Sequence, residues 1–511
     1  DRFKKSRSSS SPMIIISRDE AIINEKSRSK KVKTWRYKAK NVRDFAFTSS
    51  RKFIWDAMGV KIGDRTVMAM SYYPKEANPL YERYSTRAVA HTLNVYSKYT
   101  FDYPYPVAIS VEAANGMEYP MICFNYGRPQ KDGTYSERIK YGMISVIIHE
   151  VGHNYFPMIV NSDERQWTWM DEGLNSYLQF LTEQEWDRDY PSRRGPAKNI
   201  VNYMKSDKKN LMPIMTNSES IYQFGNNAYG KPATALNILR ETIVGRELFD
   251  FAFKEYSKTW MFKHPTPSDF FRILENASAV DLDWFWRGWF YSTDPVDISI
   301  DEVKWYTLDT RNPEIEFPLR KLDEENEPNQ SWEEKNRIGI QETIVEIDEE
   351  ANDFYNKYDP YEVTILDMED FIKYRDSSVV EPQEKRIYNS NLNYYEIKFS
   401  NVGGLVMPII LELQYEDSTN YIIRIPAEIW RKNRDQIIKV FATKKLVKSF
   451  NLDPQLETAD INLINNNWPR KTIKSKFELY KNKKNNRWKN FKENKMQRYS
   501  RLKKMEESIK E

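Results

Sequence analysis

The sequence predicts a multidomain α+β protein in which a mainly helical domain lies between β-rich segments. Three observations support this prediction. The chain has 511 residues, which is enough for several domains. Apolar residues make up 40% and charged residues 30% of it, a globular composition that excludes a disordered chain. Its apolar periodicity changes from strand-like to helical near residue 76, and back to strand-like near residue 297.

The N-terminal part is predicted to hold a tail and a short β segment. Residues 1–34 are rich in Ser, Lys and Arg, and we expect a low-complexity tail. Residues 35–75 alternate as strands do, in 34–37 and 66–73, and are expected to be the remnant of an N-terminal β domain. The chain starts at Asp1 without a Met, so we expect it to be N-terminally incomplete.

Residues 76–296 are predicted to form the helical domain. Apolar residues recur there with the period of an α-helix. The predicted helices span 87–99, 138–156, 170–186, 226–243, 246–260, 267–275 and 282–290. Pro157 is expected to end or kink the second of them.

Residues 297–469 are predicted to form a β-sandwich-like domain, because β-branched and alternating runs are separated by acidic and Pro/Asn-rich stretches. These runs are 298–300, 338–347, 394–399 and 437–443, with a charged linker at 323–334. Residues 470–511 carry 16 Lys and Arg against 5 Glu, which predicts a basic helical tail. We expect no nucleic-acid partner, and a weak contact between this tail and an anionic surface stays open.

Cysteine content and hydropathy set further limits. Cys123 is the one cysteine of the chain, so no disulfide forms within it, and its apolar neighbours predict a buried thiol. No stretch is long and apolar enough to cross a bilayer, and the first residues lack the pattern of a secretory signal. The compartment and the oligomeric state stay open.

The spacing of two of the four histidines predicts a metal site. His149 and His153 are four residues apart, so on a helix both imidazoles lie on one face and can reach one ion. Glu150, beside the first His, is placed to act as general base on a water molecule at the metal. A catalytic zinc needs a third ligand, and Glu172, nineteen residues after His153, begins the next helix. We predict one Zn²⁺ per chain, held by these two His and Glu172.

At this spacing the motifs HEVGH (149–153) and DEGLNSY (171–177) resemble those of the aminopeptidase N and leukotriene hydrolase family of zinc metallopeptidases, the gluzincins. The resemblance is to a bacterial-type member and covers roughly residues 35–295. It implies a thermolysin-like catalytic domain and, since similar bacterial members are often exported, slightly favours an exported protein. Asp171, next to Glu172, is expected to support the ligand residues.

A second motif implies a site for the substrate amine. The family has Gly-X-Met-Glu-Asn upstream of the zinc helix, and its Glu binds the free amino group of the substrate. Here Gly116, Met117 and Glu118 occupy matching positions, and Tyr119 replaces the Asn. A carboxylate that fixes a cationic amine places the first peptide bond over the metal. The backbone beside Gly116 is also expected to pair with an extended peptide.

A third motif implies an oxyanion donor. In this family a Tyr two residues before a Lys donates a hydrogen bond to the developing oxyanion, and Tyr229 with Lys231 fits that pattern. The aromatic-rich segment 267–290 resembles the end of the catalytic domain and is expected to pack in a core.

The sequence therefore predicts a zinc aminopeptidase that hydrolyses the N-terminal bond of peptides with a free N-terminus. One alternative is a zinc endopeptidase, or a hydrolase of another substrate, on the same site. A third hypothesis is a catalytically inactive peptide-binding scaffold.

Overall fold

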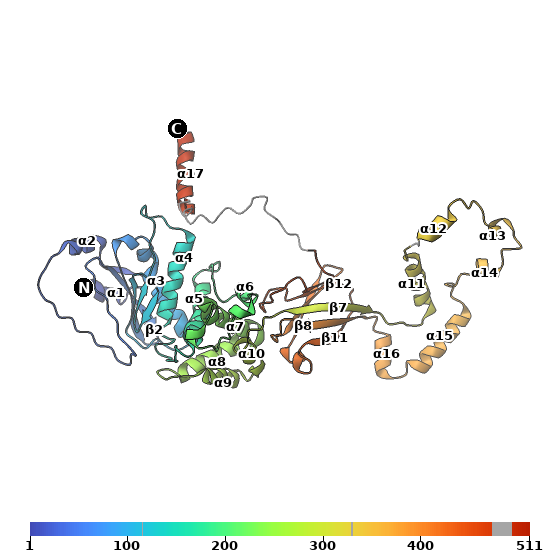
Figure 1. Ribbon diagram of the computed structural model, residues 1–511, viewed down its shortest axis with the longest axis horizontal. Helices are drawn as coiled ribbons and strands as arrows, with labels where there is room; N and C mark the ends of the chain where they lie inside the picture. The colour runs from blue at the N-terminus through green and yellow to red at the C-terminus, as the bar shows by residue number, and fades with distance from the viewer. Residues whose placement is uncertain (115, 329–330, 473–492, 511) are drawn as a thin grey trace.

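The computed structural model describes residues 1–114, 116–328, 331–472 and 493–510. Figure 1 shows the order of its parts along the longest axis. A sheet with helices lies at one end, a helical region follows, then a β-rich region, and a helical arm lies at the far end. The last helix lies near the end of the molecule that holds the sheet, where Lys495 donates a hydrogen bond to Glu137.

A six-stranded sheet forms the floor of the first region. Its strands are β1 (Met13–Ile16), β2 (Ile54–Ile62), β3 (Arg65–Tyr73), β4 (Val107–Glu112), β5 (Met117–Tyr119) and β6 (Ile122–Asn125). Their order is β1-β2-β3-β4-β6-β5, with β3, β4 and β6 parallel to one another. β5 pairs only with β6 and so forms an edge.

The N-terminal predictions need correction, although the domain boundaries themselves stay predictions. Residues 1–34 are not merely a tail, because they contain α1 (Arg2–Ser6), β1 and α2 (Arg18–Lys26). Ser17 and Glu20 form a capping box that starts α2, and β1 pairs with β2. The predicted strand at 66–73 is present as β3, but it shares one sheet with β4 to β6. No strand forms at 34–37, where Trp35 is 72% exposed.

All seven predicted helices of the central region are present. The structure has α3 (Leu80–Tyr99), α4 (Glu137–Gly152), α5 (Leu174–Trp186), α6 (Val201–Met204), α7 (Lys231–Ile238), α8 (Arg246–Thr259), α9 (Pro267–Ser278) and α10 (Asp283–Trp289). Three π-helical segments join them: η2 (Trp169–Gly173), η6 (Gly225–Gly230) and η7 (Leu239–Ile243). α3 packs on β2 and β3, and α4 packs on α3, α5 and β6. α4 ends at Gly152, earlier than predicted, with His153 as its C-cap.

Aromatic side chains from α9 and α10 close the core of this region, as predicted. Trp169 stacks on Phe271 at 5.9 Å between ring centroids, and Phe271 stacks on Trp286 at 4.5 Å. Phe290 meets Trp169 edge-on at 4.8 Å. Because Trp169 opens the segment that carries Glu172, this packing fixes the backbone beneath the predicted third ligand.

Two sheets make up the β-rich region. One contains β7 (Ile298–Tyr306), β8 (Asn393–Asn401) and β11 (Gln436–Thr443), in the order β11-β8-β7. The other contains β9 (Ile409–Tyr415), β10 (Asn420–Ile425), β12 (Val447–Leu452) and β13 (Asn467–Trp468), in the order β10-β9-β12-β13. Tyr395 of the first sheet contacts Phe450 of the second at 5.3 Å, as facing layers of a sandwich do. The predicted strands at 298–300, 394–399 and 437–443 are present.

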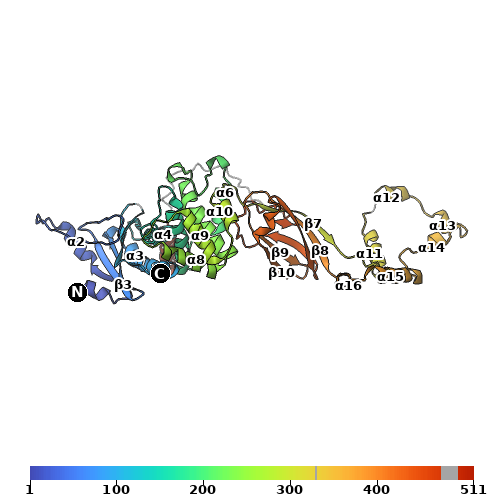
Figure 2. The ribbon, with the colours of Figure 1, turned by 90° about the horizontal axis from the view of Figure 1, so that it is seen from below.

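A helical arm is inserted between β7 and β8, and Figure 2 shows it projecting beyond the sheets. It contains α11 (Pro313–Glu325), α12 (Ser331–Arg337), α13 (Ile344–Ile347), α14 (Phe354–Lys357), α15 (Ile365–Ser378) and α16 (Pro382–Tyr388). The strand predicted at 338–347 is wrong, since a capping box of Thr343 and Glu346 starts a helical turn there. The predicted linker at 323–334 is also wrong, because it overlaps α11 and α12.

The C-terminal tail is helical where it is described. α17 (Lys495–Lys510) agrees with the prediction, while residues 473–492 of the predicted tail lie outside the described residues. Lys495 forms an ion pair with Glu137 at the start of α4, at 3.0 Å. Within the described ranges no helix is both long and apolar enough to span a membrane.

Candidate active site

The two predicted His ligands lie at the C-terminal end of α4. Ser136 caps the start of this helix by accepting a hydrogen bond from the N–H of Ile139. The last turns are buried, with His149 7% and His153 1% exposed. Burial of two imidazoles in an apolar helix is costly unless their nitrogens have polar partners. The partners of these nitrogens therefore indicate whether the two residues fit a metal ion.

The three predicted ligand atoms converge on one point. His149 Nε2 lies 3.0 Å from Glu172 Oε2 and 3.0 Å from His153 Nε2. His153 Nε2 lies 3.4 Å from Glu172 Oε2. In a tetrahedral zinc site with bonds of about 2.0–2.2 Å, ligand atoms lie roughly 3.3–3.6 Å apart. The observed triangle is close to that spacing, so the residues fit a zinc ion.

The outer nitrogens of both rings are held by hydrogen-bond acceptors. His149 Nδ1 is 2.9 Å from Gln179 Oε1, and His153 Nδ1 is 2.9 Å from the carbonyl of Phe156. Asp171 Oδ1 also lies 2.8 Å from His153 Nδ1, where it was expected to support the ligand residues. Acceptors at Nδ1 favour the tautomer whose free Nε2 lone pair binds the metal.

A second group of candidate ligands overlaps the first. Glu118, His153 and Asp171 also have ligand-type atoms within 4.8 Å of one another. In this group Asp171 lies at Nδ1 of His153, which already has the Phe156 carbonyl as partner. Only the group of His149, His153 and Glu172 directs both Nε2 atoms at a carboxylate oxygen, so we assign the ion to that group.

Glu150 faces the ligand cluster from the same helix and is 6% exposed. Its Oε2 has no hydrogen-bond partner among the described residues. Burial raises the pKa of Glu150 to about 8. Gly116 lies directly against it, because a Cβ built there would be 2.4 Å from Glu150 Oε1. The glycine therefore keeps open the space that the carboxylate occupies.

Tyr229 reaches the cluster from the π-helical segment η6. Its hydroxyl donates to Glu172 Oε1 at 2.6 Å, and its ring stacks on His149 at 5.6 Å between centroids. Burial, together with the nearby Glu172 carboxylate, raises its pKa, so the phenol stays a hydrogen-bond donor. Lys231 anchors this segment: its buried Nζ donates to the carbonyl of Ser292 at 3.0 Å, and burial lowers its pKa to about 8.

The predicted amine-binding residues lie on the edge of the sheet. Met117 and Glu118 belong to β5, which pairs with β6 through Phe124 and Cys123. Because β5 is the last strand of the sheet, its other edge has no neighbouring strand among the described residues. Glu118 lies near His153 and Glu150, and its charge helps to raise the pKa of Glu150. Asn115, the first residue of this motif, lies outside the described residues.

A cleft of about 580 Å³ opens over these groups. Gly116, His149, Glu150 and Tyr229 line it. A second cavity of about 480 Å³ adjoins it, since Arg193 and Arg194 line both. The structure thus brings together all the predicted site residues except Met117, whose side chain is 43% exposed and does not line the cleft. Cys123, predicted to be a buried thiol, is buried in β6.

Sequence reasoning missed three residues of this site. Gln179 holds His149, Ser176 contacts Arg194, and Arg194 stacks over the ring of Tyr229 at 4.1 Å. Gln179 lies seven residues after Glu172 on the same helical run, a spacing that places both on one face. Arg194 has no such signal, because a loop brings it to the cleft.

The matches to known proteins agree with this geometry. A family model described as the peptidase family M1 domain matches residues 84–289, a range that contains all the site residues named above. The predicted resemblance to aminopeptidase N-like zinc metallopeptidases is confirmed.

Named relatives match part of the chain. Glutamyl aminopeptidase of Bos taurus is 25% identical over 171 residues, covering 32% of this chain and 18% of its own length. Probable aminopeptidase 1 of Sulfurisphaera tokodaii is 24% identical over 234 residues, covering 42% of this chain and 29% of its own. The chain thus spans less than a third of the length of these curated relatives.

Solved structures are also similar. Legionella pneumophila aminopeptidase A in complex with aspartic acid has a TM-score of 0.47 and 12% identity, covering 80% of this chain and 38% of that one. The M1 zinc metallopeptidase of Deinococcus radiodurans has a TM-score of 0.38 and 20% identity, covering 46% of this chain and 51% of that one.

Proposed function

We propose that the chain is a zinc-dependent aminopeptidase that removes the first residue of peptides with a free N-terminus. The observation that carries this proposal is the convergence of His149 Nε2, His153 Nε2 and Glu172 Oε2 within 3.0–3.4 Å. Glu150 and Tyr229 flank that point, and the edge strand β5 borders it. The named aminopeptidase relatives support the same reaction class.

The ion and the general base have separate tasks. When bound by the three ligands, zinc would polarise the peptide carbonyl and make a water molecule more acidic. Glu150 Oε2, which has no other partner among the described residues, accepts the proton of the attacking water. The same carboxyl then delivers that proton to the leaving amine nitrogen.

Tyr229 supplies the oxyanion donor. Its hydroxyl, 2.6 Å from Glu172 Oε1, lies beside the ligand cluster and can donate instead to the carbonyl oxygen of the substrate. A neutral phenol with a raised pKa donates without giving up its proton.

Glu118 fixes the substrate amine. It projects from β5 close to His153, so an ammonium group on Glu118 lies next to the metal cluster. A peptide that pairs with the free edge of β5 is held extended, with its first peptide bond over the ligand cluster. Amine recognition is what separates an aminopeptidase from an endopeptidase on the same metal site.

The test compares a free-amine peptide with its N-acetylated twin. The account predicts that zinc-loaded protein cleaves the free-amine peptide at least about a hundredfold faster, in line with loss of a charge-assisted contact. Glu118→Gln should reduce that ratio. Equal cleavage of both peptides would support the endopeptidase alternative, and cleavage of neither would support the inactive scaffold.

A further inference from the structure

We propose that Arg194 binds a carboxylate of the peptide substrate, at the junction of the two cavities and beside Tyr229. This inference deepens the proposed aminopeptidase function and rests on it. It assigns to a loop of the M1 domain a role in choosing the peptide, separate from the groups that carry out hydrolysis.

The guanidinium of Arg194 lies within reach of a peptide at the ligand cluster. It stacks over the ring of Tyr229 at 4.1 Å, and that ring stacks in turn on His149 at 5.6 Å. An extended peptide advances about 3.3–3.6 Å per residue, so Arg194 lies within about three residues of the cluster. A carboxylate at that distance belongs either to the C-terminus of a very short peptide or to an acidic side chain near the cleaved bond.

Arg194 has too few partners for a partly buried charge. Within the described ranges its side chain donates one hydrogen bond, to Ser176 Oγ at 3.3 Å, and no carboxylate there comes within 4.0 Å of it. Burial lowers the pKa of Arg194. A guanidinium carries five N–H donors in a planar fork that matches a carboxylate, and a desolvated cation is costly unless an anion pairs with it. The substrate can supply that anion.

The loop holds Arg194 in a fixed place. Gly195 has a φ of +101°, and a Cβ there would lie 2.3 Å from Phe180 Cγ, so the loop is pressed against α5 at this point. Ser192 donates to Glu183 Oε2 on α5 at 2.5 Å, which ties down the other side. A charge preorganised by two such anchors loses little freedom when a ligand binds.

The charges of the cleft are arranged for a peptide with both signs. Glu118 and Glu150 lie beside the metal cluster, where a cationic amine fits. Arg193 and Arg194 line both the cleft of about 580 Å³ and the adjoining cavity of about 480 Å³. A peptide with its amine at Glu118 can therefore bring a carboxylate to the guanidinium groups that line both cavities.

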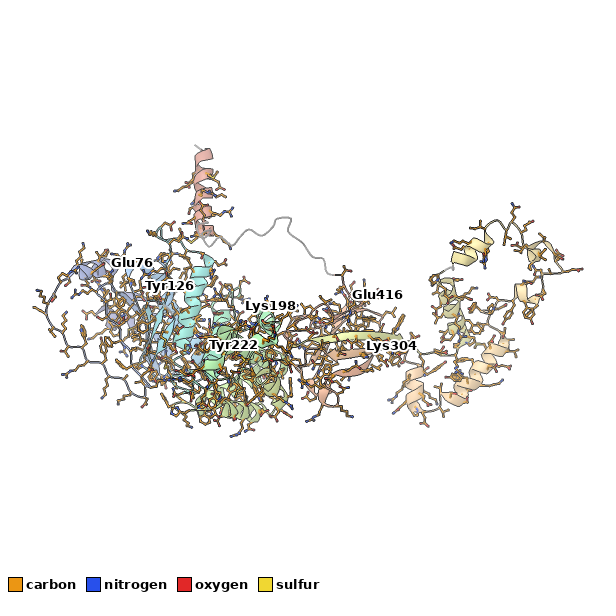
Figure 3. The ribbon with its side chains drawn as sticks, in the orientation of Figure 1. Glu76, Tyr126, Lys198, Tyr222, Lys304 and Glu416 are labelled. Carbon is orange, nitrogen blue, oxygen red and sulfur yellow. The ribbon has the colours of Figure 1, made fainter. Side chains whose placement is uncertain are left out.

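Binding to Glu150→Gln, which is expected to hold peptides without cleaving them, provides the test. Calorimetry on the zinc-loaded protein compares two matched pairs: trialanine with trialanine amide, and Glu-Ala-Ala amide with Gln-Ala-Ala amide. The first pair changes only the terminal carboxylate and the second only the side-chain carboxylate. The same four peptides are then measured with Arg194→Gln or Arg194→Lys added, and with Lys198→Gln added as control. Lys198 is exposed on the same loop and is labelled in Figure 3.

We expect one pair to show about tenfold to hundredfold tighter binding of the carboxylate form, as for a hydrogen bond to a charged group. Which pair does so identifies the source of the carboxylate. Arg194→Gln should bring that ratio to about one, Arg194→Lys should leave part of it, and Lys198→Gln should leave it whole.

The proposal is overturned if, in both pairs, the carboxylate peptide and its uncharged partner bind with equal affinity. This result comes from Glu150→Gln alone and does not depend on whether an Arg194 variant folds. It is also overturned if Arg194→Gln leaves the ratio intact. A wild-type protein that binds the carboxylate peptides selectively yet cleaves none would instead contradict the aminopeptidase function.

Discussion

The ligand cluster of His149, His153 and Glu172 differs from the substrate-facing groups Glu150 and Arg194 in how its polar atoms are paired. In the cluster, both ring nitrogens of each His and both oxygens of Glu172 have polar neighbours within 3.4 Å. Among the described residues Glu150 Oε2 has no partner, and Arg194 has only a 3.3 Å contact to Ser176. With the protons on Nδ1, the two Nε2 lone pairs and Glu172 Oε2 face one another as acceptors, which suits a permanent cation. Incompletely paired groups such as Glu150 and Arg194 suit a ligand that comes and goes.

The largest effect is expected from the cluster itself. His153→Ala removes one of three ligands and leaves the buried carboxylate of Asp171 without its imidazole partner, while Glu172 keeps His149. We predict loss of zinc and a fall in peptidase activity of at least about a thousandfold. Metal analysis and a rate assay check this, with His264→Ala as control, since His264 is exposed and remote from the cluster. Full zinc content in His153→Ala would refute the ligand assignment.

Removal of the oxyanion donor should lower the rate and spare the metal. Tyr229→Phe keeps the ring that stacks on His149 and deletes only the hydroxyl. Loss of one such donor costs about a hundredfold to a thousandfold in kcat, with KM and zinc content little changed. Steady-state kinetics beside Tyr222→Phe, an exposed tyrosine labelled in Figure 3, tests this. Equal kcat in the two variants would remove Tyr229 from the mechanism.

A methyl group at Gly116 should displace the general base. The added Cβ of Gly116→Ala would lie 2.4 Å from Glu150 Oε1, so the carboxylate has to move. Displacement of a reacting group by about 1 Å costs up to about a hundredfold in rate. Gly288→Ala on α10, away from the residues that line the cleft, is the matched control, because a Cβ there meets nothing closer than 3.4 Å. If both alanine variants retain wild-type kcat, Glu150 is less closely constrained than the structure indicates.

The smallest effect concerns a buried charge far from the cleft. Asp56 accepts hydrogen bonds from the hydroxyls of Tyr73, at 2.8 Å, and Thr86, yet burial still raises its pKa to about 6. The folded state therefore binds more protons than the unfolded state between about pH 4 and 6, and stability falls as pH rises through that window. We predict a fall of up to about 3 kcal/mol that Asp56→Asn abolishes.

Urea unfolding at several pH values checks this prediction, with the exposed Asp64→Asn as control. The same pH dependence in wild type and Asp56→Asn would show that Asp56 is not the group responsible. The result would also give the loss in free energy of unfolding that a buried charge causes where no ligand binds. That loss can be compared with the effect of the incompletely paired charge of Arg194.

Local patterns made most of the cluster predictable. One turn of helix brings His149 and His153 together. The apolar periodicity after residue 169 is enough to predict that Glu172 lies at the start of the next helix. Glu172 and Tyr229 nevertheless lie on π-helical segments, which the sequence did not predict. Such segments widen a helix locally and are frequent at functional sites.

Contacts made across long stretches of chain were not predictable. Arg194 reaches Tyr229 only because Gly195 and Ser192 dock their loop on α5, and no local pattern records that. The run 338–347 is apolar enough to be taken for a strand, yet it lies in the helical arm without a facing sheet. Strand formation depends on partners that periodicity does not reveal.

The most direct test of the account is Glu150→Gln, with zinc content and the cleavage of a free-amine peptide measured on the same sample. Glu150 makes no hydrogen bond to either imidazole of the ligand pair, so its replacement by an amide should leave the ion in place. The account predicts one zinc per chain and a rate lower by about a hundredfold to ten-thousandfold, the usual contribution of a general base. Wild-type cleavage by Glu150→Gln would contradict it.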